Sequence, residues 1–380
     1  MKTKKVSILI LPFVLFSLLS CKNGGGTSRP SFPNSKINIF STNIHTKEQE
    51  NFIITRNFDY DSIYGNKELS KPLPIKMEWF DYGKESYTLE FNDITDGTDS
   101  YYIRDITSCY YEFYNAEVDT YYDVKLYDDN DNLLDENVFK SEICVLRNLN
   151  IGGVANCRDL GGYRNTNGKI TTQGLIYRTA RMNDSYTDAV KPFINEQGQK
   201  EMLDHLKIKT EIDLRQSSNN EVGSLIEDNP GVLGPTVKYV NAPLNLNGSL
   251  LNDKNHDSIA KVFEVLGDSS NYPVVFHCKI GTDRTGLIAY LINSLCNAES
   301  EDLKLDYLFS NFANIGGTRD DSILSTYKDA IYEYDGDTLG DKTYKFLTNK
   351  IGVQPQYLDT LLKMMNADWG FDYQRKAFVT

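Results

Sequence analysis

Residues 273–296 constrain the fold of this chain more than any other stretch. Residues 273–277 (PVVFH) form a short apolar run, which is typical of a buried parallel strand. Residues 285–296 (TGLIAYLINSLC) are apolar on nearly every face and predict a buried helix. Polar residues interrupt the apolar pattern only in the loop between these two runs. A buried strand followed directly by a buried helix favours an open sheet with helices packed against it.

Strand-like and helical runs alternate over the whole C-terminal part of the chain, from about residue 148 onward. Residues 210–215 (TEIDLR) predict a second buried parallel strand. This alternation predicts an α/β domain over residues 148–380, with a central, mostly parallel sheet covered by helices on both faces. Further helices are predicted at residues 300–311, 322–334 and 356–365.

Residues 36–147 have a different character and are rich in Tyr, Phe, Ile, Thr and Asp. Their apolar residues often alternate with polar ones, as at Tyr87, Leu89 and Phe91. A period of two in short runs predicts an antiparallel β-sandwich. Residues 119–127 (DTYYDVKLY) resemble a late strand of fibronectin type III or immunoglobulin-like modules. The chain is therefore expected to place an all-β domain before the α/β domain.

Residues 1–20 predict a secretory leader rather than part of the fold. Lysines at positions 2, 4 and 5 precede an apolar run at 6–19, which is too short for a spanning helix. The run ends in LLSC, which resembles the lipobox of bacterial lipoproteins, in which the cysteine becomes the lipidated N-terminus. The alternative is an ordinary signal peptide that ends near a cysteine. Residues 21–35 then form a Gly-rich flexible tether, and we expect an extracytoplasmic protein held on a bacterial cell membrane by lipid on Cys21.

The balance of charged residues gives a formal net charge of -13. No basic patch indicates nucleic acid binding, and the acidic balance gives no long-range attraction for phosphate esters, so any anion needs a local site. The six cysteines and four histidines show no zinc-type spacing, and we expect neither a metal nor a cofactor. Cys109 and Cys144 lie in the predicted β domain and are candidates for a disulfide if the fold brings them together.

The loop at residues 277–286 (HCKIGTDRTG) is predicted to carry the chemistry. Ligands of open α/β sheets bind at the carboxyl ends of the strands. Backbone N–H groups of such a loop, together with the start of the following helix, attract an anion. The same field stabilises a thiolate, so Cys278 is predicted to attack phosphorus as a nucleophile.

Arg284 follows Cys278 by six positions, so a curled loop can present both side chains to one phosphoryl group. Its guanidinium fork matches two phosphate oxygens, which a lysine does not. Gly281 permits a sharp turn and a close backbone approach. His277 is expected to orient the loop through hydrogen bonds, and Thr285 to donate its hydroxyl to the sulfur. The predicted phosphate-binding residues are Lys279, Ile280, Gly281, Thr282, Asp283 and Arg284.

These residues resemble the cysteine-dependent tyrosine phosphatase superfamily, whose signature is His-Cys, five residues, then Arg. One bacterial branch also carries an Asn-x-Arg-Asp-Leu-Gly-Gly segment, found here at residues 156–162. The other shared segments are a Tyr-Arg-Ser-like step at 177–179, an Asp-Leu-Arg strand end at 213–215 and an Asp-Tyr-Leu-x-Ser-Asn helix end at 306–311. The resemblance covers about residues 148–365 and implies a cysteinyl-phosphate intermediate without a metal.

The chain departs from this branch at one position of the loop. Thr282 stands where the branch usually has a lysine, which in the family is associated with phosphoinositide or broad specificity. Lys279, directly after the nucleophile, is expected to supply part of the lost charge. The departure weakens the expectation of a lipid-phosphate substrate without excluding it.

A carboxyl group is needed to protonate the leaving oxygen and then to act as base for the attacking water. Asp283 is nearest in sequence and has the family's position, whereas Asp213 ends a strand expected beside the catalytic strand. Asp159 is the third candidate, although its segment equally suits a structural turn. Arg178 and Arg215 are expected to be structural ion-pair partners, and the alternative is that they contact the substrate.

The favoured prediction is a phosphomonoesterase that acts on protein phosphotyrosine. One alternative is a phosphatase for phosphoinositides or inositol phosphates. The other is a surface binding protein with a vestigial phosphatase domain, against which the intact Cys278, Asp283 and Arg284 argue. The expected partners are a phosphorylated protein or a phospholipid or inositol-phosphate substrate, and a membrane reached through the lipid anchor.

Overall fold

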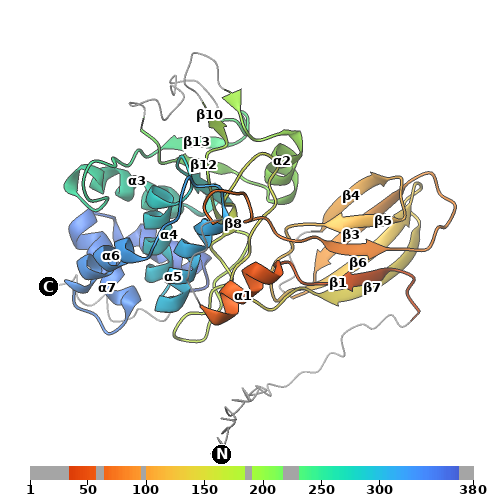
Figure 1. The fold of residues 1–380 in the computed structure, drawn as a ribbon, viewed down its shortest axis with the longest axis horizontal. Coiled ribbons are helices and arrows are strands. Elements are labelled where there is room, and N and C mark those ends of the chain that lie inside the picture. Colours follow the sequence, from red (N-terminus) through yellow and green to blue (C-terminus); the bar gives the residue numbers. More distant parts are fainter. Residues whose placement is uncertain (1–33, 57–63, 96–99, 185–190, 217–230, 368–380) are drawn as a thin grey trace, which may run out of the picture.

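A computed structural model describes residues 34–56, 64–95, 100–184, 191–216 and 231–367. It contains a β-rich region and an α/β region, which lie side by side (Figure 1). The predicted leader and most of the tether, Cys21 included, lie outside the described residues. Within those ranges, no helix has the length and apolar character needed to cross a membrane.

The β-rich region consists of two antiparallel sheets, with strand orders β4-β3-β6-β7 and β1-β2-β5. Alternate residues of β3 and β6 point into the space between the sheets and form an apolar core. The rings of Phe91 and Phe113 stack across this space with centroids 4.0 Å apart. The strands are β1 Asn38–Ser41, β2 Ile75–Glu78, β3 Tyr87–Asp93, β4 Tyr101–Ile106, β5 Tyr110–Phe113, β6 Tyr121–Asp128 and β7 Leu133–Lys140.

The α/β region is built on a five-stranded sheet with the order β13-β12-β14-β9-β8. Four strands run parallel, and β8 pairs antiparallel with β9. The predicted fold class, antiparallel sheets followed by a mostly parallel sheet with helices, is thereby confirmed. The strands are β8 Arg158–Asp159, β9 Ile176–Thr179, β12 Thr210–Asp213, β13 Lys238–Asn241 and β14 Val274–His277, with a separate ribbon of β10 Asn183–Asp184 and β11 Lys191–Pro192.

Successive side chains of β14 point to opposite faces of the sheet. Val274 and Phe276 join a large core formed with most of the helices. Val275 joins a smaller core on the other face, which contains Met202. The helices are α2 Glu196–Lys200, α3 His256–Leu266, α4 Asp283–Leu295, α5 Ser300–Phe309, α6 Ser322–Tyr332, α7 Leu339–Phe346 and α8 Pro355–Met364, with short helical turns η1 Glu201–His205, η2 Asp253–Asn255, η3 Ser269–Asn271, η4 Ser310–Phe312 and η5 Leu347–Ile351.

The structure departs from the all-β prediction for residues 36–147 at helix α1, Lys47–Thr55. A capping box between Thr46 and Gln49 starts this helix. Its Phe52 packs in the large core of the α/β region, and Arg56 just after the helix pairs with Asp302 at 2.7 Å. A helix encoded within the β region therefore stabilises the α/β region.

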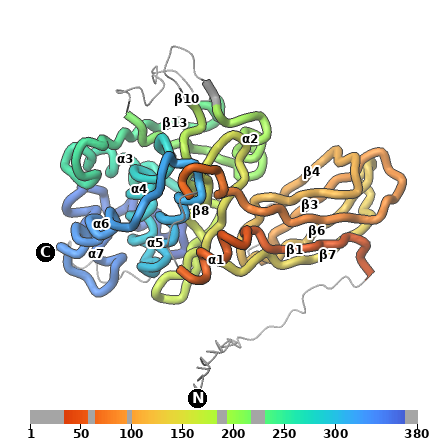
Figure 2. The backbone as a smooth tube through the Cα atoms, in the orientation of Figure 1, coloured from red at the N-terminus to blue at the C-terminus, as the bar shows by residue number. Residues whose placement is uncertain are grey.

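Residues 64–73 also lie against the α/β region before the chain returns to β2 (Figure 2). The N–H groups of Gly65 and Leu69 donate to the carbonyls of Asn311 and Phe312, both at 2.6 Å. We call residues 64–73 the strap. It brings part of the N-terminal sequence next to β8 and the end of α5.

Cys109 and Cys144 are free thiols in this structure. The carbonyl of Cys109 accepts from Trp79, at the end of β2 that faces the start of β1. Cys144 follows Glu142, whose N–H donates to Thr42 just beyond the end of β1. The two cysteines therefore lie at opposite ends of β1 and do not form the disulfide considered from the sequence.

Candidate active site

The predicted catalytic loop joins β14 to α4, in the middle of the sheet. Cys278 directly follows β14, and Arg284 lies in the first turn of α4. Both side chains are buried, with 1% and 2% of their surfaces exposed. Because β14 is flanked by parallel strands on both sides, Cys278 sits at the carboxyl edge of the sheet, where α/β folds bind ligands.

Gly281 lets the loop press against the end of β9. Its φ of 71° is in the left-handed region, which favours glycine. A Cβ atom there would also lie 2.7 Å from the backbone of Thr179 and Ala180. Any side chain at this position would push the loop away from the sheet.

Asn156 holds the loop through two of its backbone carbonyls. Its side-chain amide donates to the carbonyls of Ile280 at 3.1 Å and Gly281 at 3.0 Å. In a trans peptide, each carbonyl points away from the N–H of the next residue. With these carbonyls turned toward Asn156, the N–H groups of Gly281 and Thr282 point the other way. That is the orientation required for binding an anion in the curve of the loop.

A buried ion network reinforces this contact. Arg158 donates to Asp306 at 2.8 Å, and Arg178 makes a short contact with the other oxygen of the same carboxylate. Arg178 also donates to the carbonyl of Gly281 at 2.8 Å. Burial opposes the charge of Asp306, but the two guanidinium groups outweigh it and hold the pKa of Asp306 below its usual value. Arg178 thus forms the ion pair that the sequence predicts.

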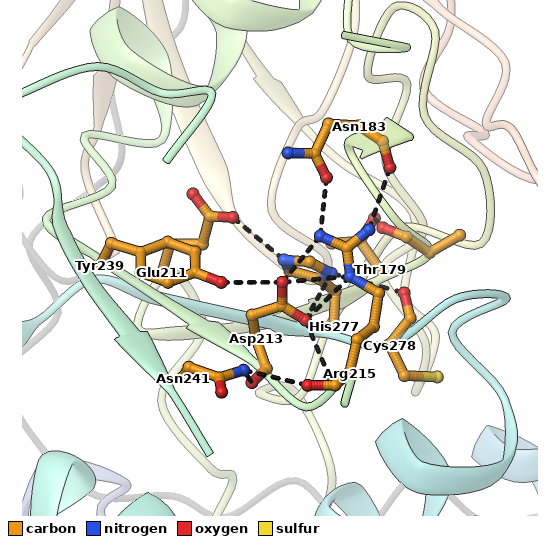
Figure 3. Close-up of polar contacts among 10 residues, drawn as sticks. Thr179, Asn183, Glu211, Asp213, Arg215, Tyr239, Asn241, His277 and Cys278 are labelled. Carbon is orange, nitrogen blue, oxygen red and sulfur yellow. Dashed lines mark hydrogen bonds and ion pairs between the residues drawn. The ribbon is translucent and has the colours of Figure 1, made fainter. Parts of the chain in front are cut away.

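A second buried network lies on the β12 side of β14 (Figure 3). His277 Nε2 contacts Glu211 at 3.0 Å, and His277 Nδ1 lies 3.9 Å from Asp213. Asp213 accepts hydrogen bonds from the Arg215 guanidinium and, at 2.9 Å, from the hydroxyl of Tyr239. Burial disfavours ionised Asp213, yet His277 and Arg215 keep its pKa below the usual value. Asp213 is therefore a buried, ion-paired carboxylate.

Asp159 lies in a different setting from the loop. It is on β8 opposite Tyr177, is fully buried, and pairs with Arg147 at 2.8 Å. It also accepts the N–H groups of Gly161 and Gly174, both at 2.7 Å. Burial raises the pKa of Asp159 despite these partners. Because Arg147 donates further to two carbonyls of the β-rich region, this pair connects the two regions.

Asp283 is the first residue of α4, and 36% of its side chain is exposed. Its carboxylate contacts Arg319 at 3.2 Å. Among the three predicted acids, Asp283 alone is accessible to solvent, because Asp159 and Asp213 are both fully buried. Arg319 is a contact that the sequence analysis missed, and no local pattern marks it.

Of the remaining loop residues, some are buried and others are partly exposed to solvent. Thr282 is fully buried, and its hydroxyl lies 3.4 Å from the side-chain amide nitrogen of Asn156. Thr285 is also buried, and its hydroxyl has no hydrogen-bond partner within the described part of the chain. Lys279 and Ile280 are partly exposed. The loop therefore presents one cationic side chain and one apolar side chain toward solvent.

A buried cysteine after a parallel strand, then a loop and an arginine in the first helical turn, is the arrangement expected of a cysteine-dependent phosphatase. The chain belongs to the tyrosine phosphatase family, whose sequence profile matches residues 149–373. A Cupriavidus necator protein named "Putative tyrosine-protein phosphatase" is 23% identical over 242 residues, which are 57% of this chain and 78% of that protein.

Two solved structures show weaker similarity. The core catalytic domain of the PP-IP phosphatase SIW14 from S. cerevisiae has 17% identity and a TM-score of 0.27, and the match covers 42% of this chain and 90% of that one. P. aeruginosa TpbA in complex with pTyr has 15% identity and a TM-score of 0.26, with 50% and 86% covered. With TM-scores this low, membership of the family rests on the sequence match.

Proposed function

We propose that this chain hydrolyses phosphotyrosine in proteins through a cysteinyl-phosphate intermediate. The observation that carries the proposal is the loop between β14 and α4. It holds Cys278 and Arg284 at its two ends, while Asn156 and Arg178 turn its carbonyls outward. A phosphoryl group in the curve would meet backbone N–H groups and a guanidinium fork, which suit the charge of its equatorial oxygens.

In the first step, the Cys278 thiolate attacks phosphorus and forms the S–P bond as the bond to the tyrosine oxygen breaks. Asp283 gives its proton to that oxygen, so tyrosine leaves as a neutral phenol. In the second step, water attacks phosphorus, the S–P bond breaks, and Asp283 takes the proton from the water. The buried hydroxyl of Thr285 is the donor to the departing sulfur, because it has no other partner within the described residues. The products are tyrosine and inorganic phosphate.

Asp283 is assigned the acid–base role because the other candidates are committed elsewhere. Asp213 is enclosed by Arg215 and Tyr239, and Asp159 pairs with Arg147 at the junction of the two regions. Only Asp283 combines exposure with a position directly before Arg284. Within this proposal, His277 and Asp213 support the strand end, and Asp159 supports the junction.

The test is phosphate release by the full chain and by Cys278→Ser. The substrates are phosphotyrosine peptides, phosphoserine peptides, phosphoinositides and inositol phosphates. We expect phosphotyrosine peptides to be the best substrates and Cys278→Ser to abolish release. Faster turnover of phosphoinositides or inositol phosphates would replace the substrate assignment by the first alternative. No release from any substrate by folded, reduced protein would favour the binding-protein alternative.

We further propose that the protein is a lipoprotein anchored through Cys21 on the outer side of a bacterial cell membrane, with the β-rich region as an immunoglobulin- or fibronectin-like module. The leader and lipobox-like sequence support the anchor, and the two facing antiparallel sheets support the module. Cells expressing the full chain are labelled with radioactive palmitate, beside a Cys21→Ala control. Equal labelling of the two proteins would exclude the anchor.

A further inference from the structure

A cavity of about 390 Å³ opens beside the catalytic loop. Lys279 and Ile280 form one of its walls, directly after the nucleophile in sequence. Glu68 and Lys71 of the strap also line it, as does Phe193. The cavity is therefore built jointly by the N-terminal sequence and the phosphatase domain.

Backbone contacts fix the walls of the cavity without a ligand. The N–H of Ala180 donates to Ala155 at 3.0 Å, and that of Arg181 donates to Lys279 at 3.2 Å. Gly153, also in the wall, has a φ of 81°, and a Cβ there would lie only 1.8 Å from the carbonyl oxygen of Phe193. The backbone of the cavity wall is consequently preformed, so binding costs little free energy for ordering it.

The charges in the cavity wall are unbalanced toward positive. The side-chain ammonium groups of Lys71 and Lys279 form no ion pair or hydrogen bond with any residue that the structure describes, although the backbone carbonyls of both residues accept hydrogen bonds. The carboxylate of Glu68 is held by other groups, because it accepts hydrogen bonds from the N–H groups of Ser70 at 3.2 Å and Asn314 at 3.3 Å. The cavity is therefore locally positive, although the chain as a whole has a formal net charge of -13. It favours a group that carries negative charge.

We propose that this cavity binds an acidic side chain adjacent to the phosphotyrosine of the substrate, and this inference rests on the proposed function. Val154, Ile280 and Phe193 give the cavity apolar walls, against which the methylene groups of a glutamate pack. Lys71 and Lys279 then receive its carboxylate. An inositol phosphate fits less well, because the ring hydroxyls that face Val154, Ile280 and Phe193 would lose water without gaining hydrogen bonds.

The reach of a peptide agrees with this assignment. Neighbouring Cα atoms are about 3.8 Å apart in a polypeptide, so residues flanking the phosphotyrosine stay close to the catalytic loop. Lys279 is adjacent to Cys278 and lines the cavity, so the phosphate site and the cavity share a wall. Lys71 is the specificity-determining residue in this scheme, because it lies outside the loop and contacts only the neighbouring side chain.

The experiment compares peptides with Glu, Gln or Ala at each position flanking the phosphotyrosine, and para-nitrophenyl phosphate, which has no flanking group. The proteins are the full chain, Lys71→Gln and Lys71→Arg. We expect Lys71→Gln to lower kcat/KM for the Glu peptide about three- to fivefold through KM, as for a partly exposed charge pair. Turnover of the Gln peptide and of para-nitrophenyl phosphate should not change, and Lys71→Arg should keep the preference for Glu.

Equal kcat/KM for the Glu and Gln peptides in the unsubstituted chain would overturn the proposal. So would a loss in Lys71→Gln that is the same for every substrate, since it would show a purely structural role. Faster, Lys71-dependent turnover of inositol polyphosphates would overturn the peptide assignment and give the cavity to a second phosphate group.

Binding to catalytically inert protein separates this proposal from the proposed function. Titration of the Glu and Gln peptides into Cys278→Ser and into Cys278→Ser/Lys71→Gln measures the cavity without turnover. A Lys71-dependent preference for the Glu peptide supports the cavity even if the unsubstituted chain releases no phosphate. Active enzyme without that preference would overturn the cavity proposal and leave the proposed function intact.

Discussion

Two buried polar networks flank strand β14 and the proposed catalytic loop that follows it, and each network contacts a different part of this segment. On the β9 side, Arg158, Arg178 and Asp306 join Asn156 in holding the backbone of the loop itself. On the β12 side, the network of Asp213 and its neighbours contacts His277, the last residue of the strand (Figure 3). The first network holds the loop that is proposed to bind phosphate, whereas the second holds the end of the strand before it. Equal losses of stability on the two sides should therefore have unequal effects on activity.

The largest effect is expected for Asp306→Asn. This change leaves Arg158 and Arg178 buried without their carboxylate, and removing one member of a buried ion pair costs about 3–5 kcal/mol of unfolding free energy. Asp213→Asn is the matched control. It should cost less unfolding free energy, because it leaves only Arg215 without its carboxylate and Arg215 keeps its hydrogen bonds to Asn183. Urea unfolding and kcat below the transition measure both effects. Equal kcat in the two variants would contradict the proposed difference between the networks.

The same two carboxylates predict how stability depends on acid. Burial works against each charge, but the neighbouring cations keep both pKa values below normal in the folded state. The unfolded-state pKa of Asp is about 3.9, so the unfolded chain binds more protons as the pH falls below about 5. The stability that these two ionised carboxylates contribute is thus complete near neutral pH and is lost in acid. The stability difference between the unsubstituted chain and Asp306→Asn should shrink from pH 7 to pH 3, and a constant difference would refute this.

A sharper comparison uses two asparagines with the same chemistry. The side-chain amide of Asn156 donates to two loop carbonyls, and that of Asn241 donates to the carbonyls of Asp213 and Arg215. Replacing either by Ala should cost about 1–3 kcal/mol of stability, because each change removes two hydrogen bonds to backbone carbonyls. Only Asn156→Ala should also lower kcat, by about tenfold, since a small displacement of a catalytic group is costly. A similar fall in kcat for Asn241→Ala would remove the distinction between the networks.

The sequence predicts the strand, the loop and the following helix because their signals are local. Residues 273–277 and 285–296 correspond to β14 and α4, since continuous apolar runs identify buried elements. Helix α1 was missed because its apolar residues cluster at its end and form no stripe, although the capping box at Thr46 was readable.

The contacts that hold the loop in place could not be predicted from the sequence in the same way. Ser70 and Asn156 are 86 positions apart, and Arg178 and Gly281 are 103 apart. Contacts between such distant segments leave no periodic trace in a single sequence. Asn156 and Arg158 were visible only as part of a family motif, without any indication of what they touch.

The smallest effect is expected for Ser70→Ala in the strap. The hydroxyl of Ser70 accepts the N–H of Asn156 at 3.3 Å, so Ser70 is expected to act on the loop through Asn156. Loss of this bond should lower kcat about two- to threefold and stability by about 1 kcal/mol. In the double variant Ser70→Ala/Asn156→Ala, the effect of Ser70→Ala on kcat should vanish, because the residue that transmits it is gone. Additive effects on kcat would mean that the strap influences the active site by another route, such as the cavity wall at Lys71.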